Sequence, residues 1–268
     1  KYIFMGIEYM KTFQKSILYF LILLFIIIFY LISRFSFKNG KPTCSNYVLN
    51  VYLYLSLSII ILGLLCYFIN KLLNFLNVNI LNNNIIFFYL LGIILFFVFG
   101  IWLSFRKLYS KEGHALNHIL WLLFLVGTSI MLFPLFIQEN SAPYIDDALL
   151  STSLIFLFMS IIVYMFPSFF EKTYNYMIVG LVVGLIAIIV IEVINLILNF
   201  GSEKYHTFRK YLAYAIIVLF SLFVSYDTVN VFKQARQCVN YPNYPKSSLD
   251  FLLDILNLFS NILYLYQR

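Results

Sequence analysis

The chain has 268 residues, of which 63% are hydrophobic and 11% are charged, and its mean hydropathy is +0.92. A soluble domain carries about 25% charged residues, so this composition excludes a water-soluble globular protein and predicts several membrane spans. The net charge of +7 does not indicate nucleic-acid binding, because the Lys and Arg residues cluster at the ends of apolar runs, where such residues anchor and orient helices.

Eight apolar runs follow one another, and each long run is near the ~20 residues that a helix needs to cross a hydrocarbon core. The first resembles a signal-peptide core, but no small-residue cleavage site follows it, so we expect a retained anchor. The predicted fold is an all-α, polytopic membrane helix bundle of about eight helices. We expect the spans at residues 16–33, 47–70, 85–105, 114–136, a fifth ending near 165, 176–200, 211–232 and 248–266.

Charged residues between the runs predict the orientation only weakly. Asp146 and Asp147 suit the first turn of the fifth helix, where negative charge meets the positive end of the helix dipole. With eight crossings, the loops at Arg106 and Arg236 lie on one side of the membrane and the acidic loop at Asp146 on the other. Lys and Arg are almost equally frequent on both sides, and we place the two basic loops in the cytosol or the mitochondrial matrix.

Three cysteines have no metal-ligand spacing. Cys66 lies inside a span, whereas Cys44 and Cys238 lie in loops. The sequence leaves a disulfide between the two loop cysteines open. His114 and His118 are spaced like two metal ligands, but without a third ligand we favour polar residues at a helix start.

Two aspartates lie within apolar runs near the end of the chain. Asp227 interrupts residues 219–232, and Asp254 interrupts residues 249–265. A carboxylate at bilayer depth costs about 2.5–3.5 kcal/mol, so it faces protein or water and is functional by default. One face of the last helix carries a polar stripe at i, i+4, i+7 and i+11, formed by Asp250, Asp254, Asn257 and Asn261. This stripe predicts that the last helix lies inside the bundle and lines an internal path.

These residues also carry a family resemblance. Tyr226-Asp227-Thr228, a loop of mixed charge, and Leu-Asp-Ile-Leu-Asn-Leu-Phe at residues 253–259 resemble the closing signature of the transmembrane Bax-inhibitor-motif family. Weaker matches lie at residues 102–107, 127–134 and 166–184. The similarity covers about residues 47–266 and is closest to the mitochondrial growth-hormone-inducible transmembrane branch, which also has an additional N-terminal helix. It implies an anchor helix and loop at residues 1–46, and a seven-helix domain with a central last helix at residues 47–268.

The resemblance implies a function and a set of site residues. In the family, the pair that matches Asp227 and Asp254 shares a proton and senses pH beside a calcium path, and an arginine at the position of Arg106 pairs with the acids and closes the path. Two neighbouring carboxylates cannot both ionise at low cost, and deprotonated they offer the hard oxygen ligands that calcium prefers. The implied protein is a calcium leak channel or calcium/proton exchanger rather than an enzyme, without a cofactor, and calcium is its transported ion.

Each of these residues also has a plainer interpretation. Asp227 and Asp254 suit a neutral, hydrogen-bonded pair that only holds two helices together. Arg106 suits an ordinary membrane anchor. Asp250 either widens the acidic site or, as we favour, sits in the first turn of its helix. Glu192 either joins a proton or cation route or bonds a neighbouring helix as a neutral acid, and Asn257 is a secondary candidate on the stripe.

Two other functions compete with transport. Large side chains replace some of the family's small ones, which suits a non-catalytic structural subunit of a larger mitochondrial membrane complex. An intramembrane aspartyl protease is a remote alternative, because the Gly-x-Gly-Asp signature of that class is missing before Asp254. The expected partners are the lipid bilayer, calcium, protons and such complex subunits. The expected compartment is the mitochondrial inner membrane, with the endoplasmic reticulum or Golgi as alternatives.

Overall fold

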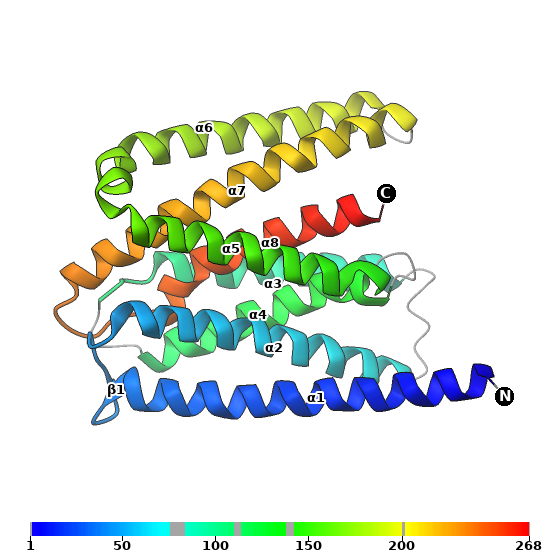
Figure 1. Cartoon of the computed structure of the whole chain (residues 1–268), viewed down its shortest axis with the longest axis horizontal. Helices are drawn as coiled ribbons and strands as arrows, with labels where there is room; N and C mark the ends of the chain where they lie inside the picture. The colour runs from blue at the N-terminus through cyan, green and yellow to red at the C-terminus, as the bar shows by residue number, and fades with distance from the viewer. Residues whose placement is uncertain (1, 76–83, 110–113, 138–141, 200–201, 268) are drawn as a thin grey trace. The chain divides into compact units, whose positions relative to one another are not determined.

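The computed structural model describes residues 2–75, 84–109, 114–137, 142–199 and 202–267. Within these ranges nearly the whole chain is helical (Figure 1). In chain order the elements are α1 (Tyr2–Phe35), β1 (Phe37–Lys38), β2 (Lys41–Pro42), α2 (Tyr47–Phe75), α3 (Asn84–Phe105), α4 (His114–Ile137), η1 (Ala142–Tyr144), α5 (Ile145–Met165), α6 (Pro167–Asn199), α7 (Glu203–Gln237) and α8 (Tyr244–Tyr266). Each of these 8 α-helices contains a stretch long and apolar enough to cross a membrane. The predicted all-α, multi-pass fold is therefore confirmed.

Several helices extend beyond the apolar runs that predicted them, α6 and α7 among them. α6 begins at Pro167 rather than near residue 176, and α7 begins at Glu203 rather than near residue 211. These extensions are polar, so hydropathy does not mark them. A proline is tolerated at a helix start because the first N–H groups have no intrahelical partner in any case. The first turn of α5 carries Asp146 and Asp147, as predicted.

The last helix also begins earlier than predicted, at Tyr244 rather than at Ser248. Asn243 caps it, because its Oδ1 accepts a hydrogen bond from the backbone N–H of Lys246 at 3.2 Å. Such a cap satisfies one of the donors that a helix start leaves without a partner. Asp250 therefore lies in the second turn of α8, and its predicted position in the first turn is wrong.

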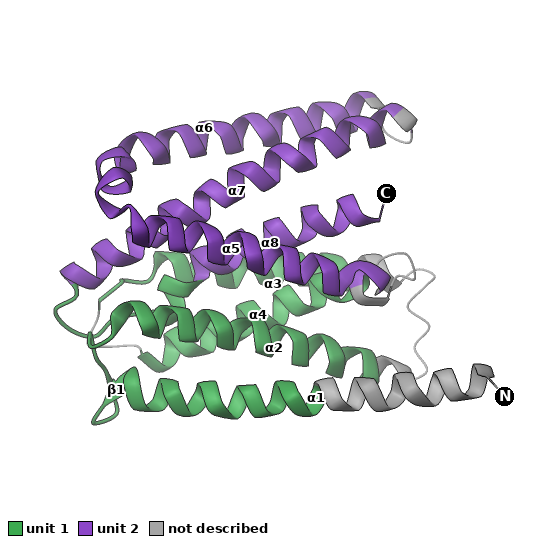
Figure 2. Cartoon of the chain, in the orientation of Figure 1, with its two compact units in different colours: residues 1–134, 238–248 green, residues 135–237, 249–268 purple. Residues whose placement is uncertain are grey.

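The chain forms two compact units (Figure 2). Unit 1 comprises residues 1–134 and 238–248, which include α1 to α3, most of α4 and the start of α8. Unit 2 comprises residues 135–237 and 249–268, which include α5, α6, α7 and the remainder of α8. The predicted division at residue 46 remains a prediction.

Buried polar contacts join α2 and α4 in unit 1. The hydroxyl of Tyr54 lies 2.8 Å from Nε2 of His118, whose Nδ1 lies 2.7 Å from the carbonyl oxygen of His114. Because a carbonyl can only accept, Nδ1 of His118 is the donor and Nε2 accepts from Tyr54. Trp121 Nε1 donates to Ser58 Oγ at 3.0 Å. Both ring nitrogens of His118 are thus engaged, and the described residues contain no cluster of three metal-ligating side chains.

Two glycines allow α3 and α4 to approach closely in unit 1. A Cβ added to Gly92 would lie 2.6 Å from the backbone N of Met131, and one added to Gly127 would lie 2.7 Å from the backbone N of Phe96. Contacts this short with a backbone cannot be relieved by turning a side chain. The helix pair therefore depends on the missing side chains, as in other close helix contacts within membranes.

In unit 2, α7 packs against both α6 and α5. The part of α8 that belongs to unit 2 contacts α5 through the rings of Phe251 and Phe156, whose centroids are 5.4 Å apart, and through the hydroxyls of Tyr266 and Ser151 at 2.8 Å. In the span of α8, 56% of the residues are buried, against 6% in the span of α6. The expected burial of the last helix is confirmed, and the span of α6 is the least buried one in unit 2.

Gly127→Ala should destabilise the protein by about 1–3 kcal/mol, the usual cost of forcing an extra carbon into a close-packed contact. Thermal unfolding of the purified protein in detergent should show a lower midpoint. Gly180→Ala is the matched control, because no atom lies within 4 Å of a Cβ added there and alanine favours a helix by about 1 kcal/mol. Equal midpoints for the two variants would contradict the close approach of α3 and α4.

Candidate ion site on the last helix

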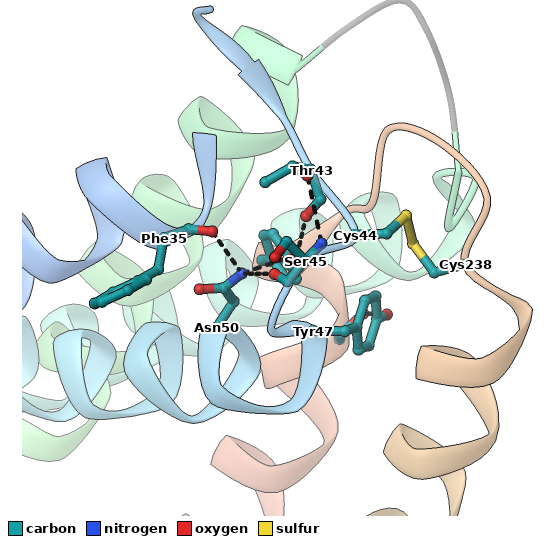
Figure 3. Close-up of a disulfide and its surroundings, with 9 residues drawn as sticks. Phe35, Thr43, Cys44, Ser45, Tyr47, Asn50 and Cys238 are labelled. Carbon is teal, nitrogen blue, oxygen red and sulfur yellow. Dashed lines mark hydrogen bonds between the residues drawn. A yellow bond between two sulfur atoms is a disulfide. The ribbon is translucent and has the colours of Figure 1, made fainter. Parts of the chain in front are cut away.

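A disulfide fixes the segment that leads into α8. Cys44, between β2 and α2, is bonded to Cys238, which follows α7, and their Cα atoms are 5.8 Å apart (Figure 3). Both cysteines belong to unit 1. The bond that the sequence left open is therefore formed, and it joins parts of the chain that are 194 residues apart. Cys66, the third cysteine, is buried and free.

Hydrogen bonds reinforce the disulfide. Asn50 Nδ2 donates to the carbonyl oxygen of Ser45 at 2.9 Å and to that of Phe35 at 3.2 Å (Figure 3). It also donates at 3.0 Å to the hydroxyl of Tyr244, which itself donates to the carbonyl oxygen of Thr43. One amide thus links the end of α1, the start of α2 and the first residue of α8.

The connection between α3 and α4 is attached to the same segment. The backbone N–H of Asn243 donates to the carbonyl oxygen of Leu108 at 2.8 Å, and Lys246 Nζ donates to that of Arg106 at 2.6 Å. The side chain of Arg106 is half-buried, and its Nε donates to Asn117 Oδ1 at 2.9 Å. The predicted pairing of Arg106 with the aspartates remains a prediction.

The two predicted acids meet in unit 2. Asp227 of α7 and Asp254 of α8 have relative exposures of 8% and 4%, and their side chains are hydrogen-bonded to each other. An ionised carboxylate can only accept a hydrogen bond, so a bond between two carboxyl groups requires a proton on one of them. A pair bonded in this way would hold one proton and carry at most one negative charge.

One carboxylate oxygen of this pair has no hydrogen-bond donor among the described residues. It is Oδ2 of Asp254, which is buried. Asp250, one turn earlier on α8, is exposed and interacts electrostatically with both acids. Loss of the shared proton would leave a cluster of carboxylate oxygens from two helices, which are hard ligands suited to a divalent cation such as calcium.

A chain of hydroxyl groups begins beside Asp227 and was not anticipated from the sequence. Tyr226 donates to the hydroxyl of Tyr174 at 2.8 Å, and Tyr174 donates to Asn230 Oδ1 at 3.1 Å. The two tyrosine rings stack at 4.6 Å, and Lys233 Nζ lies 3.2 Å from the centroid of the Tyr174 ring. The repeat of polar residues at 226, 230 and 233 along one face of α7 was the available signal.

The other predicted polar residues occupy defined positions in unit 2. Asn257 is half-buried and its Nδ2 donates to the carbonyl oxygen of Leu253 at 2.8 Å, while Asn261 is buried and contacts Arg209. Glu192 forms an ion pair with Arg209, whose Nε lies 3.0 Å from Glu192 Oε1. Of the two interpretations of Glu192, the bond to a neighbouring helix is present, with Arg209 of α7 as its partner.

Comparisons with known proteins identify what this arrangement resembles. The family model described as inhibitor of apoptosis-promoting Bax1 matches residues 44–268. Two uncharacterized proteins from two strains of Helicobacter pylori are similar, with 31% and 30% identity over 174 residues. Each alignment covers 63% of this chain and 68% of the relative. The family match begins at Cys44, so α1 lies outside it. The closer resemblance to the mitochondrial branch remains a prediction.

The disulfide bears on the predicted orientation. With eight membrane crossings, one side of the membrane holds both disulfide cysteines, Cys44 and Cys238, and the two basic loops at Arg106 and Arg236. Disulfides persist in oxidising compartments. The placement of these loops in the cytosol or matrix, which rested on a small difference in Lys and Arg, remains a prediction, and the disulfide favours the opposite side of the membrane. We expect them on the oxidising side, in a periplasm, a lumen or an intermembrane space.

A reporter attached after Arg268 tests this orientation, because α8 carries the chain back across the membrane from Cys238. In a bacterial host, a green fluorescent protein at this position should be bright and an alkaline phosphatase inactive. Alkylation without reductant should modify only Cys66 after denaturation, and Cys44→Ser should release the thiol of Cys238 and lower stability by about 2–4 kcal/mol. Active phosphatase, or three alkylated cysteines, would contradict the orientation that the disulfide favours.

Proposed function

Since this chain belongs to the Bax inhibitor family, as its match over residues 44–268 shows, we propose that it is a pH-sensitive calcium leak channel or calcium/proton exchanger. The observation that carries the proposal is the buried, hydrogen-bonded pair of Asp227 and Asp254. Such a pair stores one proton in the membrane and presents oxygen ligands once that proton leaves.

Three features of unit 2 support transport rather than simple helix cohesion. Asp254 keeps one buried oxygen without a partner, which a pair serving only to hold helices together would satisfy. Asp250 adds a third carboxyl group on the exposed side of the pair. The polar stripe then continues along α8 through Asn257 and Asn261, so the acids form one end of a line of oxygen-bearing side chains.

The mechanism follows from the shared proton. With the proton in place, the pair carries at most one negative charge and binds a divalent cation weakly. When the proton leaves, repulsion between the two carboxylates is relieved by a cation between them. Binding of calcium and binding of the proton are therefore mutually exclusive, which gives an exchanger if each cycle moves both ions and a pH-gated leak if only calcium moves.

Calcium flux into liposomes that contain the purified protein tests this proposal. Asp254→Asn retains the shape but removes one ionisable group, so flux should fall by about tenfold, which corresponds to about 1.4 kcal/mol in the barrier, and should lose its pH dependence. Asp227→Asn should have the same effect. The double variant should add little, because contacting residues that act as one unit are not additive.

Asp147→Asn is the matched control for these variants, because Asp147 is an exposed carboxylate in the first turn of α5. It should leave flux and its pH dependence unchanged. Wild-type protein without flux at any pH, while the two aspartates remain hydrogen-bonded, would exclude transport and favour the structural-subunit alternative. Cleavage of a transmembrane peptide that both aspartate variants abolish would instead favour the protease.

A further inference from the structure

A second charged cluster of unit 2 lies near the other end of the stripe on α8. Arg209 of α7 forms its ion pair with Glu192 of α6, and its Nη2 donates to Asn261 Oδ1 of α8 at 2.9 Å. The centre of the guanidinium group also lies 4.9 Å from the centroid of the Tyr264 ring. One arginine side chain thus joins three helices that all have membrane-spanning length.

The two asparagines of the stripe connect this cluster with the aspartate pair. Asn257 Nδ2 donates to the carbonyl oxygen of Leu253, and Asn261 Nδ2 donates to that of Asn257, both at 2.8 Å. Because each amide group bonds back to its own helix, its Oδ1 is directed elsewhere, and that of Asn261 meets Arg209. Seven residues of helix separate Asp254 from Asn261, which is about 10 Å at 1.5 Å per residue.

The cluster differs from an ion pair that only joins helices. Nη1 of Arg209 is buried and has no hydrogen-bond partner among the described residues. Buried donors of structural pairs are normally satisfied. The side chain of Glu192 is 39% exposed, whereas that of Arg209 is 17% exposed. The negative charge therefore faces outward, and the incompletely bonded positive charge faces the stripe.

We propose that Arg209 is the electrostatic gate of the path along α8, and that Glu192 sets the strength of the gate. This inference rests on the proposed cation transport. A guanidinium group stays protonated at all physiological pH values, so it repels a cation that moves along the stripe whatever the state of the aspartates. Glu192 offsets part of that repulsion because its carboxylate lies against the same guanidinium group.

If Arg209 acts as the gate, substitutions of the two partners of this ion pair should change calcium flux in opposite directions. Arg209→Gln removes the repelling charge and should raise calcium flux by at least about tenfold. One unit charge about 10 Å from a divalent cation, at an effective dielectric constant of about 20, corresponds to a factor on the order of a hundred or more, and Glu192 already offsets part of it. Glu192→Gln leaves the guanidinium group uncompensated and should lower flux. Arg209→Lys keeps the positive charge and should leave flux low, and the double variant should resemble Arg209→Gln. A purely structural pair would instead give losses of stability, and of any flux, in the same direction for both partners.

Calcium entry into dye-loaded liposomes measures these effects, and thermal unfolding of each variant checks the fold. Arg236 and Glu171 form the matched control, because they are also an arginine–glutamate pair between α7 and α6 but have side-chain exposures of 63% and 34%. Arg236→Gln and Glu171→Gln should leave flux unchanged.

The outcomes separate this inference from the proposed function. Flux that Asp254→Asn reduces but Arg209→Gln leaves at the wild-type value would overturn the gate and leave the proposed transport standing. A wild-type protein with no flux that gains it in Arg209→Gln, and loses it again with Asp254→Asn, would support both. Absence of flux in every variant would overturn both, and equal losses in Arg209→Gln and Glu192→Gln would reduce the pair to a structural role.

Discussion

A bilayer offers no water to a buried polar group, so such a group needs a partner within the protein. This constraint explains how the buried polar side chains of unit 2 are paired. Asp227 and Asp254 are tolerated inside their spans because both are buried and face each other between α7 and α8. Arg209 is tolerated because two of its nitrogens have partners: Nε pairs with Glu192, and Nη2 donates to Asn261. Asp254 and Asn261 of α8 therefore each depend on a partner on α7, whereas Asn257 bonds back to its own helix.

The two parts of α8, before and after residue 249, make different contacts. Its first residues are tied to the loops of unit 1 by the disulfide, by Asn50 and by Lys246. From Leu249 onward the helix belongs to unit 2, where it carries the acids and the two asparagines. One helix thus combines a start that is bonded to the loops of unit 1 with a remainder that carries the polar face in unit 2.

Much of this fold could be predicted from the sequence, because the thickness of a bilayer sets the length of an apolar helix. Helix ends were predicted less well, since caps such as Asn243 and polar extensions such as the start of α7 leave no trace in hydropathy. The aspartate pair could be predicted because charged residues stand out in an apolar run. The disulfide could not, because sequence spacing does not report the distance between two loops.

The Arg209–Glu192 pair was missed for a different reason. Each residue alone looks like an isolated charge, and the pairing follows only from the hairpin that α6 and α7 form. Glu192 lies seven residues before the end of α6 at Asn199, and Arg209 lies six residues after the start of α7 at Glu203. Nearly equal distances from the connection of an antiparallel helix pair bring two residues level with each other, and this rule would have indicated the pair.

The long interval between Cys44 and Cys238 has a consequence for biosynthesis. A ribosome adds about 5–20 residues per second, so the 194 residues between them take on the order of ten to forty seconds to make. With the orientation expected from the disulfide, Cys44 remains a thiol on the oxidising side during that interval, where it can exchange with other thiols. Closure of the bond thereby marks the moment at which α7 has crossed the membrane, so oxidation at this site reports insertion of nearly the whole chain.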